Sequence, residues 1–283
     1  MLRQLEEVYY PESLEAALAK MREYGGAASP IAGGTDIVPD PPPGIRCLVD
    51  ITRLGLDYIE ETEEQIRIGA TATMQKVAIS PQVASLAGGL LSRATCDGWP
   101  LPVRNAATIG GNLASAGPWA DTPPALLALD AVAVVVDKNG EKRIPLQDFF
   151  LDYRKTAIGT GLLKEIVIPK PGAATRGLFM KLGRTSVDQA MVNVGVLVEF
   201  DGSRCCRKVR IALGAVTGRP SRVKQVEELL VDRPLEETLI EKAVKLVTEL
   251  VEPVLDFRAS ADYRREMSGV LLRRALRMLA QAS

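Results

Sequence analysis

The chain has 283 residues, which is enough for about two domains that each bury a core of their own. Its 35 basic and 35 acidic side chains cancel, so no long-range field would hold a nucleic acid. The longest apolar stretch, residues 125–136, contains Asp130 and is shorter than the ~20 residues that a bilayer helix needs, so we expect no membrane span. The first residues lack the order of a signal peptide, which favours a cytoplasmic location.

The sequence contains no histidine. Ser-His and Cys-His nucleophile pairs and His-ligated metal sites are therefore excluded. The cysteines form no C-x-x-C pair, so we expect reduced, largely buried thiols and no metal in this chain; they are Cys47, Cys96, Cys205 and Cys206. If the chain does chemistry, a cofactor is expected to carry it.

Hydrophobic periodicity predicts both helices and strands in the first half of the chain. One helix is expected over residues 13–24, where Gly25-Gly26 ends it, and another from the cap Thr73 to Ile79. A further helical turn or two is expected after Pro123. Strands are predicted over residues 29–32, 47–51, 66–70 and 132–136, and a stiff proline loop over residues 39–43.

The prolines and the glycine of residues 168–172 predict a domain boundary, and the second half has a simpler pattern. Strands are expected over 192–200 and 209–216, and helices over 221–230, 235–251 and 260–280. The last helix is basic on one face. We favour a core helix with a solvated face over a docking surface for an acidic partner. The sequence thus predicts an α+β fold with a small sheet backed by helices from residue 173 onward.

Two glycine-rich segments are candidates for a binding site: the first glycine segment (residues 30–37) and the second glycine segment (residues 108–115). Paired glycines let consecutive backbone N–H groups converge on an anion, and nearby hydroxyl groups add donors, so a diphosphate would fit. Neither segment matches the Rossmann or P-loop fingerprint. The alternative is that each Gly-Gly pair is only a tight turn, but two similar segments in one domain favour a shared ligand.

Other candidate residues lie beyond these segments. Asp121 could accept a hydrogen bond from a sugar hydroxyl, or it could cap a helix. Lys181 and Arg184 could stabilise negative charge on a reduced redox ring, or they could lie on a solvated strand edge. Trp99 and Trp119 flank the second glycine segment, where either indole could pack on a cofactor ring or belong to the core.

Together these residues closely resemble the FAD-binding medium subunits, or FAD domains, of molybdenum hydroxylases of the xanthine dehydrogenase and aerobic carbon monoxide dehydrogenase type. The resemblance spans essentially the whole chain. Its motifs, in chain order, are residues 11–17, 32–36, 104–114, 118–121, 153–156, 166–169, 181–188 and 256–265. Two departures, the proline-rich approach at 100–103 and the bulky Trp119, leave the choice of electron acceptor open.

The resemblance implies a PCMH-type FAD-binding domain over residues 1–172, with subdomains of about 1–57 and 58–172, and a C-terminal domain over 173–283. It places FAD contacts at Pro30, Ile31, Ala32, Gly33, Gly34, Thr35, Asp36, Ile37, Thr108, Ile109, Gly110, Gly111, Asn112, Ser115, Asp121, Leu163 and Lys181. Among them Asp121 would bind a sugar hydroxyl, and Lys181 would stabilise negative charge on the reduced flavin. It assigns no other catalytic residue and no metal ligand.

The implied function is electron transfer. A large partner subunit with the molybdenum cofactor would oxidise the substrate, and a small partner subunit with two [2Fe-2S] clusters would pass electrons to FAD. The reduced flavin would deliver them to NAD, quinone, ferredoxin or oxygen, in an assembly expected to be a dimer of heterotrimers.

Two alternatives remain open: a non-catalytic nucleotide-binding subunit and a self-sufficient flavin oxidase. The absence of histidine and of an acid–base pair near the glycine segments argues against the oxidase.

Overall fold

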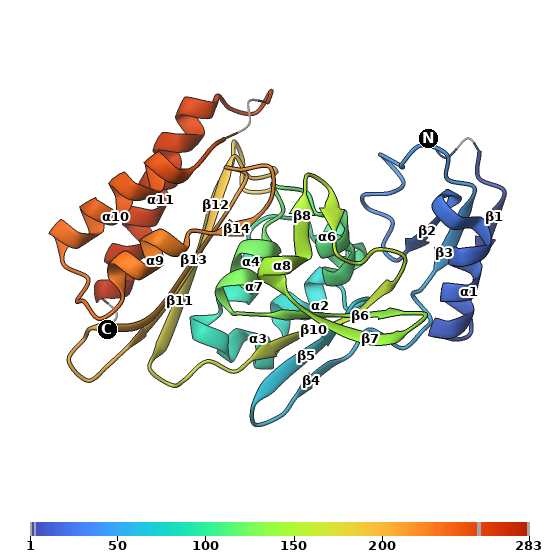
Figure 1. Ribbon diagram of the computed structural model, residues 1–283, viewed down its shortest axis with the longest axis horizontal. Coiled ribbons are helices and arrows are strands. Elements are labelled where there is room, and N and C mark those ends of the chain that lie inside the picture. Colours follow the sequence, from blue (N-terminus) through green and yellow to red (C-terminus); the bar gives the residue numbers. More distant parts are fainter. Residues whose placement is uncertain (1, 3, 254–255, 282–283) are drawn as a thin grey trace.

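Three units follow one another along the long axis of the molecule, with the N-terminal unit at one end and the C-terminal unit at the other (Figure 1). The computed structural model describes residues 2, 4–253 and 256–281. Helices and strands are mixed throughout, as the sequence predicts. No helix among these residues combines the length and the hydropathy needed to cross a bilayer.

The N-terminal unit is a parallel three-stranded sheet in the order β1 (Glu7–Tyr9), β3 (Cys47–Asp50), β2 (Ala28–Ile31), with one helix, α1 (Leu14–Tyr24). The hydroxyl of Ser13 caps α1 by accepting from the Ala16 N–H at 3.1 Å. Gly25, with φ 56°, ends it, and a short 3₁₀ turn, η1 (Gly25–Ala27), leads into β2. The helix and strand predicted for residues 13–32 are thus confirmed to within one residue.

The central unit is built on an antiparallel five-stranded sheet. Its order is β4 (Ile59–Glu61), β5 (Gln65–Gly69), β10 (Leu162–Pro169), β6 (Val132–Asp137) and β7 (Gly140–Pro145). The chain between β5 and β6 forms the short helices α2 (Met74–Ile79), α3 (Pro81–Ser85), η2 (Leu86–Gly88), α4 (Leu90–Cys96), α5 (Leu101–Ala106), α6 (Ile109–Ser115) and α7 (Thr122–Ala128). Helix α8 (Leu146–Phe149) and the hairpin of β8 (Phe150–Asp152) and β9 (Lys155–Thr156) follow β7.

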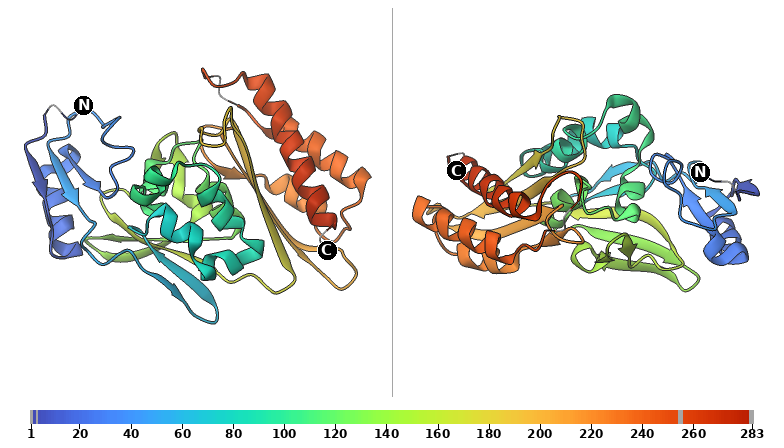
Figure 2. Two further views of the ribbon diagram at one scale, coloured as in Figure 1. Left: turned by 180° about the vertical axis from the view of Figure 1, so that it is seen from behind. Right: turned by 90° about the horizontal axis from the view of Figure 1, so that it is seen from above.

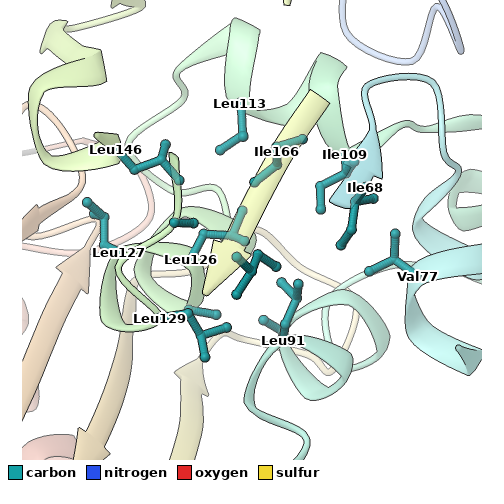
Figure 3. Packing of buried hydrophobic residues seen from close by; sticks show 14 of the residues in the cluster. Ile68, Val77, Leu91, Ile109, Leu113, Leu126, Leu127, Leu129, Leu146 and Ile166 are labelled. Atoms are coloured by element: carbon teal, nitrogen blue, oxygen red, sulfur yellow. The ribbon is translucent and has the colours of Figure 1, made fainter. Parts of the chain in front are cut away.

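The core of the central unit lies between this sheet and the helices (Figure 3). Ile68 and Ile166 of the sheet are fully buried beside Leu91, Ile109 and Leu126 of the helices. Burial of such side chains contributes about 1.5–3 kcal/mol each. The helical segment is therefore tied to the sheet by its apolar faces, and it carries the second glycine segment with it.

The C-terminal unit is an antiparallel four-stranded sheet in the order β11 (Thr175–Leu182), β12 (Val192–Phe200), β13 (Cys206–Gly214) and β14 (Ser221–Arg222). Three helices complete it: α9 (Lys224–Leu230), α10 (Glu237–Leu250) and α11 (Ala261–Gln281). The two long helices cover the outer side of this sheet (Figure 2), and α7 packs on its inner side. Gly195 of β12 permits that approach, because a Cβ there would lie 2.6 Å from the Pro124 carbonyl oxygen.

Several sequence predictions for this unit need correction. The helix expected to start at Ser221 starts at Lys224, because Ser221 and Arg222 pair with β13 as strand β14. The strand expected from Val209 starts at Cys206. In the central unit, the expectation of largely buried thiols is wrong for Cys96, which is exposed at the end of α4.

The basic face of α11 contacts α10 of the same chain. Arg273 donates to Glu241 at 2.6 Å, and Arg277 pairs with Glu237. Arg264 in the first turns of α11 is buried, at 3% exposed. The prediction of a core helix with a solvated face therefore describes α11 better than a docking surface for an acidic partner.

An ionic network joins the central and C-terminal units at Asp130, in the turn between α7 and β6. Its carboxylate accepts from Arg210 and Arg222 at 2.9 Å and pairs with Lys208 at 2.7 Å. Arg222 also pairs with the buried Glu227 of α9 at 2.5 Å. Burial alone would raise the pKa of Asp130, but the hydrogen bonds from Lys208 and Arg210 outweigh it and hold that pKa below the ordinary value.

We predict that Asp130→Asn lowers the free energy of unfolding by about 2 kcal/mol at pH 7, because it removes the carboxylate that Lys208, Arg210 and Arg222 share in the seam. Because the pKa of Asp130 in the folded state is below the ordinary value, its ionised carboxylate stabilises the fold at pH values above the usual pKa of an aspartate. This contribution is lost as the pH falls through the folded-state value, so the two proteins should converge in acid. Denaturant unfolding at pH 7 and at about pH 2 measures both effects.

Glu249→Gln is the control, since Glu249 is exposed and its ion pair with Lys245 on the same helix is long, at 4.0 Å. It should change the unfolding free energy by less than about 0.5 kcal/mol. Equal losses for both variants would contradict a special role for Asp130.

Candidate functional site

The first glycine segment lies directly against the residues that lead into the second. A Cβ built on Gly33 would lie 1.8 Å from the carbonyl oxygen of Ala106, which ends α5 just before the second glycine segment. Only glycine permits this contact. The sequence prediction that both segments belong to one site thus has a geometric basis.

The first glycine segment leaves its backbone donors free. It follows the end of β2, with Pro30 and Ile31 in the strand, and turns at Gly34, where φ is 68°. The Val38 N–H donates to the Gly34 carbonyl at 3.1 Å, whereas the N–H groups of residues 33–37 donate to no described residue. A run of free donors at the start of such a turn is suited to bind an anion.

The Asp36 side chain in this segment faces the protein. Arg154, in the turn between β8 and β9, donates to Asp36 and to Asp40 at 2.7 Å each. This pair of bonds fixes the turn beyond the segment to the central unit. Asp36 therefore supports the shape of the segment through its side chain, and Thr35 beside it is exposed.

The second glycine segment is a helix and not a loop. Thr108 caps α6 by accepting from the Gly111 N–H at 3.1 Å, so the alternative of a tight turn is also wrong. The N–H groups of Ile109 and Gly110 donate to Ala72 and Ala70 at 3.0 and 2.9 Å. The expected cradle of free N–H groups is therefore absent here, because the segment uses its first donors to attach itself to the loop after β5.

The side of α6 that remains open is formed by Gly111 and Asn112. A Cβ on Gly111 would meet only the Thr108 hydroxyl, at 2.9 Å. The Asn112 Oδ1 accepts from the Thr122 hydroxyl at 2.5 Å, while its Nδ2 donates to no described residue. Ser115 turns inward, since its hydroxyl donates to the Asn112 carbonyl at 3.1 Å. One amide donor and an exposed glycine thus remain available to a ligand.

Asp121 and Lys181 form a buried ion pair. The Lys181 Nζ lies 2.8 Å from the Asp121 Oδ2, and the two side chains are 6% and 3% exposed. The Asn193 Nδ2 donates to the Asp121 Oδ1 at 2.7 Å. Burial raises the pKa of the Asp121 carboxyl, and the Lys181 ammonium and the Asn193 amide oppose that rise. The alternative of a solvated strand edge is therefore wrong for Lys181, and Asp121 makes no helix-capping bond.

The C-terminal unit holds every residue of the turn at residues 118–121. The Ala215 N–H donates to the Pro118 carbonyl at 2.7 Å, and Asn193 donates to the Ala120 carbonyl at 3.1 Å. The guanidinium of Arg258 stacks on the Trp119 ring at 4.5 Å. Sequence reasoning missed Asn193 and Arg258 as contributors, although a lone amide in the apolar strand 192–200 was a detectable signal.

The remaining predicted residues lie in different surroundings. Leu163 is 6% exposed at a bulge of β10 within the central core. Trp99 is half-buried against the same core, and its Nε1 has no described acceptor. Trp119 meets Tyr153 edge-on at 6.3 Å. Arg184, by contrast, pairs with Asp188 on the surface at 2.8 Å and takes no part in the buried cluster.

Family comparisons identify the class of protein. A family model described as "FAD binding domain in molybdopterin dehydrogenase" matches residues 3–171. A second, described as "CO dehydrogenase flavoprotein C-terminal domain", matches residues 177–279. The chain belongs to this family and carries its FAD-binding domain. The free donors of the first glycine segment and the open face at Gly111 fit a diphosphate such as that of FAD.

Individual relatives agree over nearly the full length. The chain is 30% identical over 276 residues to the nicotinate dehydrogenase FAD-subunit of Eubacterium barkeri, covering 92% of this chain and 91% of the relative. It is 30% identical over 275 residues to the carbon monoxide dehydrogenase medium chain of Afipia carboxidovorans, covering 95% of each. The solved carbon monoxide dehydrogenase of Hydrogenophaga pseudoflava matches with a TM-score of 0.95 at 29% identity, over 100% of this chain and 99% of that one. The resemblance and the α+β fold predicted from the sequence are confirmed.

We predict that Gly33→Ala lowers the free energy of unfolding by at least about 2 kcal/mol, because its methyl group would displace a backbone carbonyl. Gly111→Ala should change it by less than about 1 kcal/mol, since only a hydroxyl must move and alanine favours the helix. Denaturant unfolding of both variants tests this difference. Equal unfolding free energies would show that the first glycine segment does not make the close contact with Ala106.

Proposed function

We propose that this chain is the FAD-carrying electron-transfer subunit of a molybdenum hydroxylase. It would take electrons from an iron–sulfur subunit and pass them to an external acceptor, which could be NAD, quinone, ferredoxin or oxygen. The observation that carries the proposal is the row of free N–H groups at residues 33–37, in a segment that packs against the residues leading into α6, in a chain of this family.

The proposed FAD contacts fall into three groups. Residues 30–37 bind the diphosphate mainly through backbone N–H groups, and residues 108–112 together with Ser115 border it, with the Asn112 amide as the available donor. Asp121 and Lys181 lie where the C-terminal domain meets the 118–121 turn, and we propose that they contact the sugar and ring portions of the cofactor. Leu163 is proposed as an apolar contact on the other side of that turn.

When bound, FAD would supply an acceptor that holds one or two electrons. The chain's own part is to bind, orient and shield. Lys181 lies in a nearly dry seam, where a positive charge stabilises nearby negative charge far better than it would in water. Asn193 keeps the Asp121 carboxylate turned toward Lys181, so the orientation of both groups is fixed before any ligand arrives.

The domain limits and the assembly are also part of the proposal. We place the FAD-binding domain at residues 1–172 and the C-terminal domain at 173–283, which the two family matches support. Relatives named as medium chains and FAD-subunits support partners: a large subunit with the molybdenum cofactor and a small subunit with [2Fe-2S] clusters. We propose a dimer of such heterotrimers in the cytoplasm.

The test is a visible absorption spectrum of the purified chain with anaerobic dithionite titration and identification of the released chromophore. We expect flavin bands that bleach with two electrons and released FAD. Gly111→Val should weaken FAD binding about 100-fold or more, because the side chain fills the open face while the fold is kept. A folded, colourless chain that takes up no added FAD would contradict the proposal.

Gly33→Val should lose FAD as well, because its side chain would collide with the Ala106 carbonyl and displace the first glycine segment. Gly26→Ala is the matched control, since a Cβ at Gly26 meets nothing within 4 Å, and it should retain FAD fully. Full retention of flavin in a folded Gly111→Val variant would show that the open face of α6 is not part of the site.

A further inference from the structure

We propose that Arg258 is a positioning residue: it fastens the surface segment of residues 183–189 to the FAD-binding domain and so sets how an external acceptor reaches the site. The inference rests on the proposed function for the acceptor. Its structural part, the fastening of the segment, stands on contacts within the chain alone.

Arg258 joins two domains through its ring contacts. Its guanidinium lies 4.5 Å from the Trp119 ring of the central unit and 4.7 Å from the ring of its neighbour Phe257. Its side chain is only 10% exposed, although Phe257 is 81% exposed. A cation–π contact is stronger where the cation is removed from water. Arg258 is thus held in place between two aromatic rings at the edge of the seam.

The edges of the same guanidinium make directed hydrogen bonds. One Nη donates to the Gln189 side chain, and the other donates to Asp256 at 2.7 Å. Asp256 also accepts from the buried Arg264 at 2.6 Å, and Arg264 donates to the Met191 carbonyl at 3.1 Å. The motif of residues 256–265 therefore holds the end of the surface segment at two successive points.

The segment itself has few other attachments. It begins just after Lys181, whose side chain is fixed in the buried pair, and it returns to the sheet at Met191, whose N–H donates to the Leu182 carbonyl at 2.8 Å. Between these ends, Asp188 inside the segment is the one ion-pair partner of Arg184 among the described residues, and Val187 is 50% exposed. Loosening Arg258 would therefore free the segment without disturbing Lys181.

This position matters for access because the segment and the stacked rings border the same seam. Trp119 belongs to the turn whose next residues are Ala120 and Asp121, and its other neighbour, Tyr153, is 51% exposed. A molecule approaching the buried Asp121–Lys181 pair from solvent would pass this rim. A lysine could stack on Trp119, but it lacks the planar fork needed to bond Gln189 and Asp256 together.

The first test is limited trypsin proteolysis of the full chain, with and without FAD, in which mass spectrometry follows cleavage after Arg184. Arg258→Met should speed this cleavage about 10-fold, because the local opening of the segment becomes more frequent. Arg258→Lys should fall in between, and Gln189→Ala, which removes only the bridging bond, should act in the same direction. Arg265→Met is the control, since Arg265 pairs only with the exposed Asp262.

The second test is stopped-flow reoxidation of the dithionite-reduced, FAD-loaded chain by a water-soluble quinone. Arg258→Met should change the second-order rate constant by about 3-fold or more while the flavin potential stays as in the parent chain. Cleavage as slow as in the control, or faster cleavage with an unchanged reoxidation rate, would overturn the proposal. The two failures can be told apart. A chain that binds no FAD would contradict the proposed function. Unchanged cleavage of the FAD-free Arg258→Met variant would contradict the role of Arg258 alone.

Discussion

The buried ion pair between Asp121 and Lys181 is the contact on which the arrangement of the two domains depends. Each charge comes from a different domain, and each is almost entirely removed from water. An unpaired charge in such a place costs several kcal/mol, so the two domains must keep the orientation that brings Nζ and Oδ2 within 2.8 Å. Gly98 leaves the necessary room, because a Cβ there would lie 2.1 Å from Asp121.

The polar groups of the site divide into fixed and free ones. The first donors of α6, the Asp36 carboxylate and the Asn193 amide are bonded within the chain and set the shape of the site. The N–H groups of residues 33–37 and the Asn112 Nδ2 donate to no described residue, and they belong to the two glycine segments. The C-terminal domain therefore shapes the site by holding the 118–121 turn, and the free donors all belong to the FAD-binding domain.

Local signals in the sequence predicted much of the fold. Thr73 caps a helix as expected, a helix follows Ser13, and the β-branched runs at 132–136 and 192–200 are strands. Contacts between distant residues were not predictable: the second glycine segment became a helix because Ala70 and Ala72 accept its first N–H groups. Lys181 was expected on a solvated strand edge or beside a flavin. It is instead buried in an ion pair with Asp121, which lies sixty positions earlier in the sequence. Arg258 lies in the motif of residues 256–265, but its role could not be predicted from the sequence because it depends on contact with the distant Trp119.

A double-mutant cycle of Asp121→Asn and Lys181→Met, read by denaturant unfolding, tests the central role of the buried pair most directly. Either single change leaves the other polar group without its partner in the seam, whereas the double change removes both. We therefore expect a coupling free energy of at least about 2 kcal/mol, with the double variant more stable than the sum of the single losses implies. Losses that add to within about 0.5 kcal/mol would contradict the account.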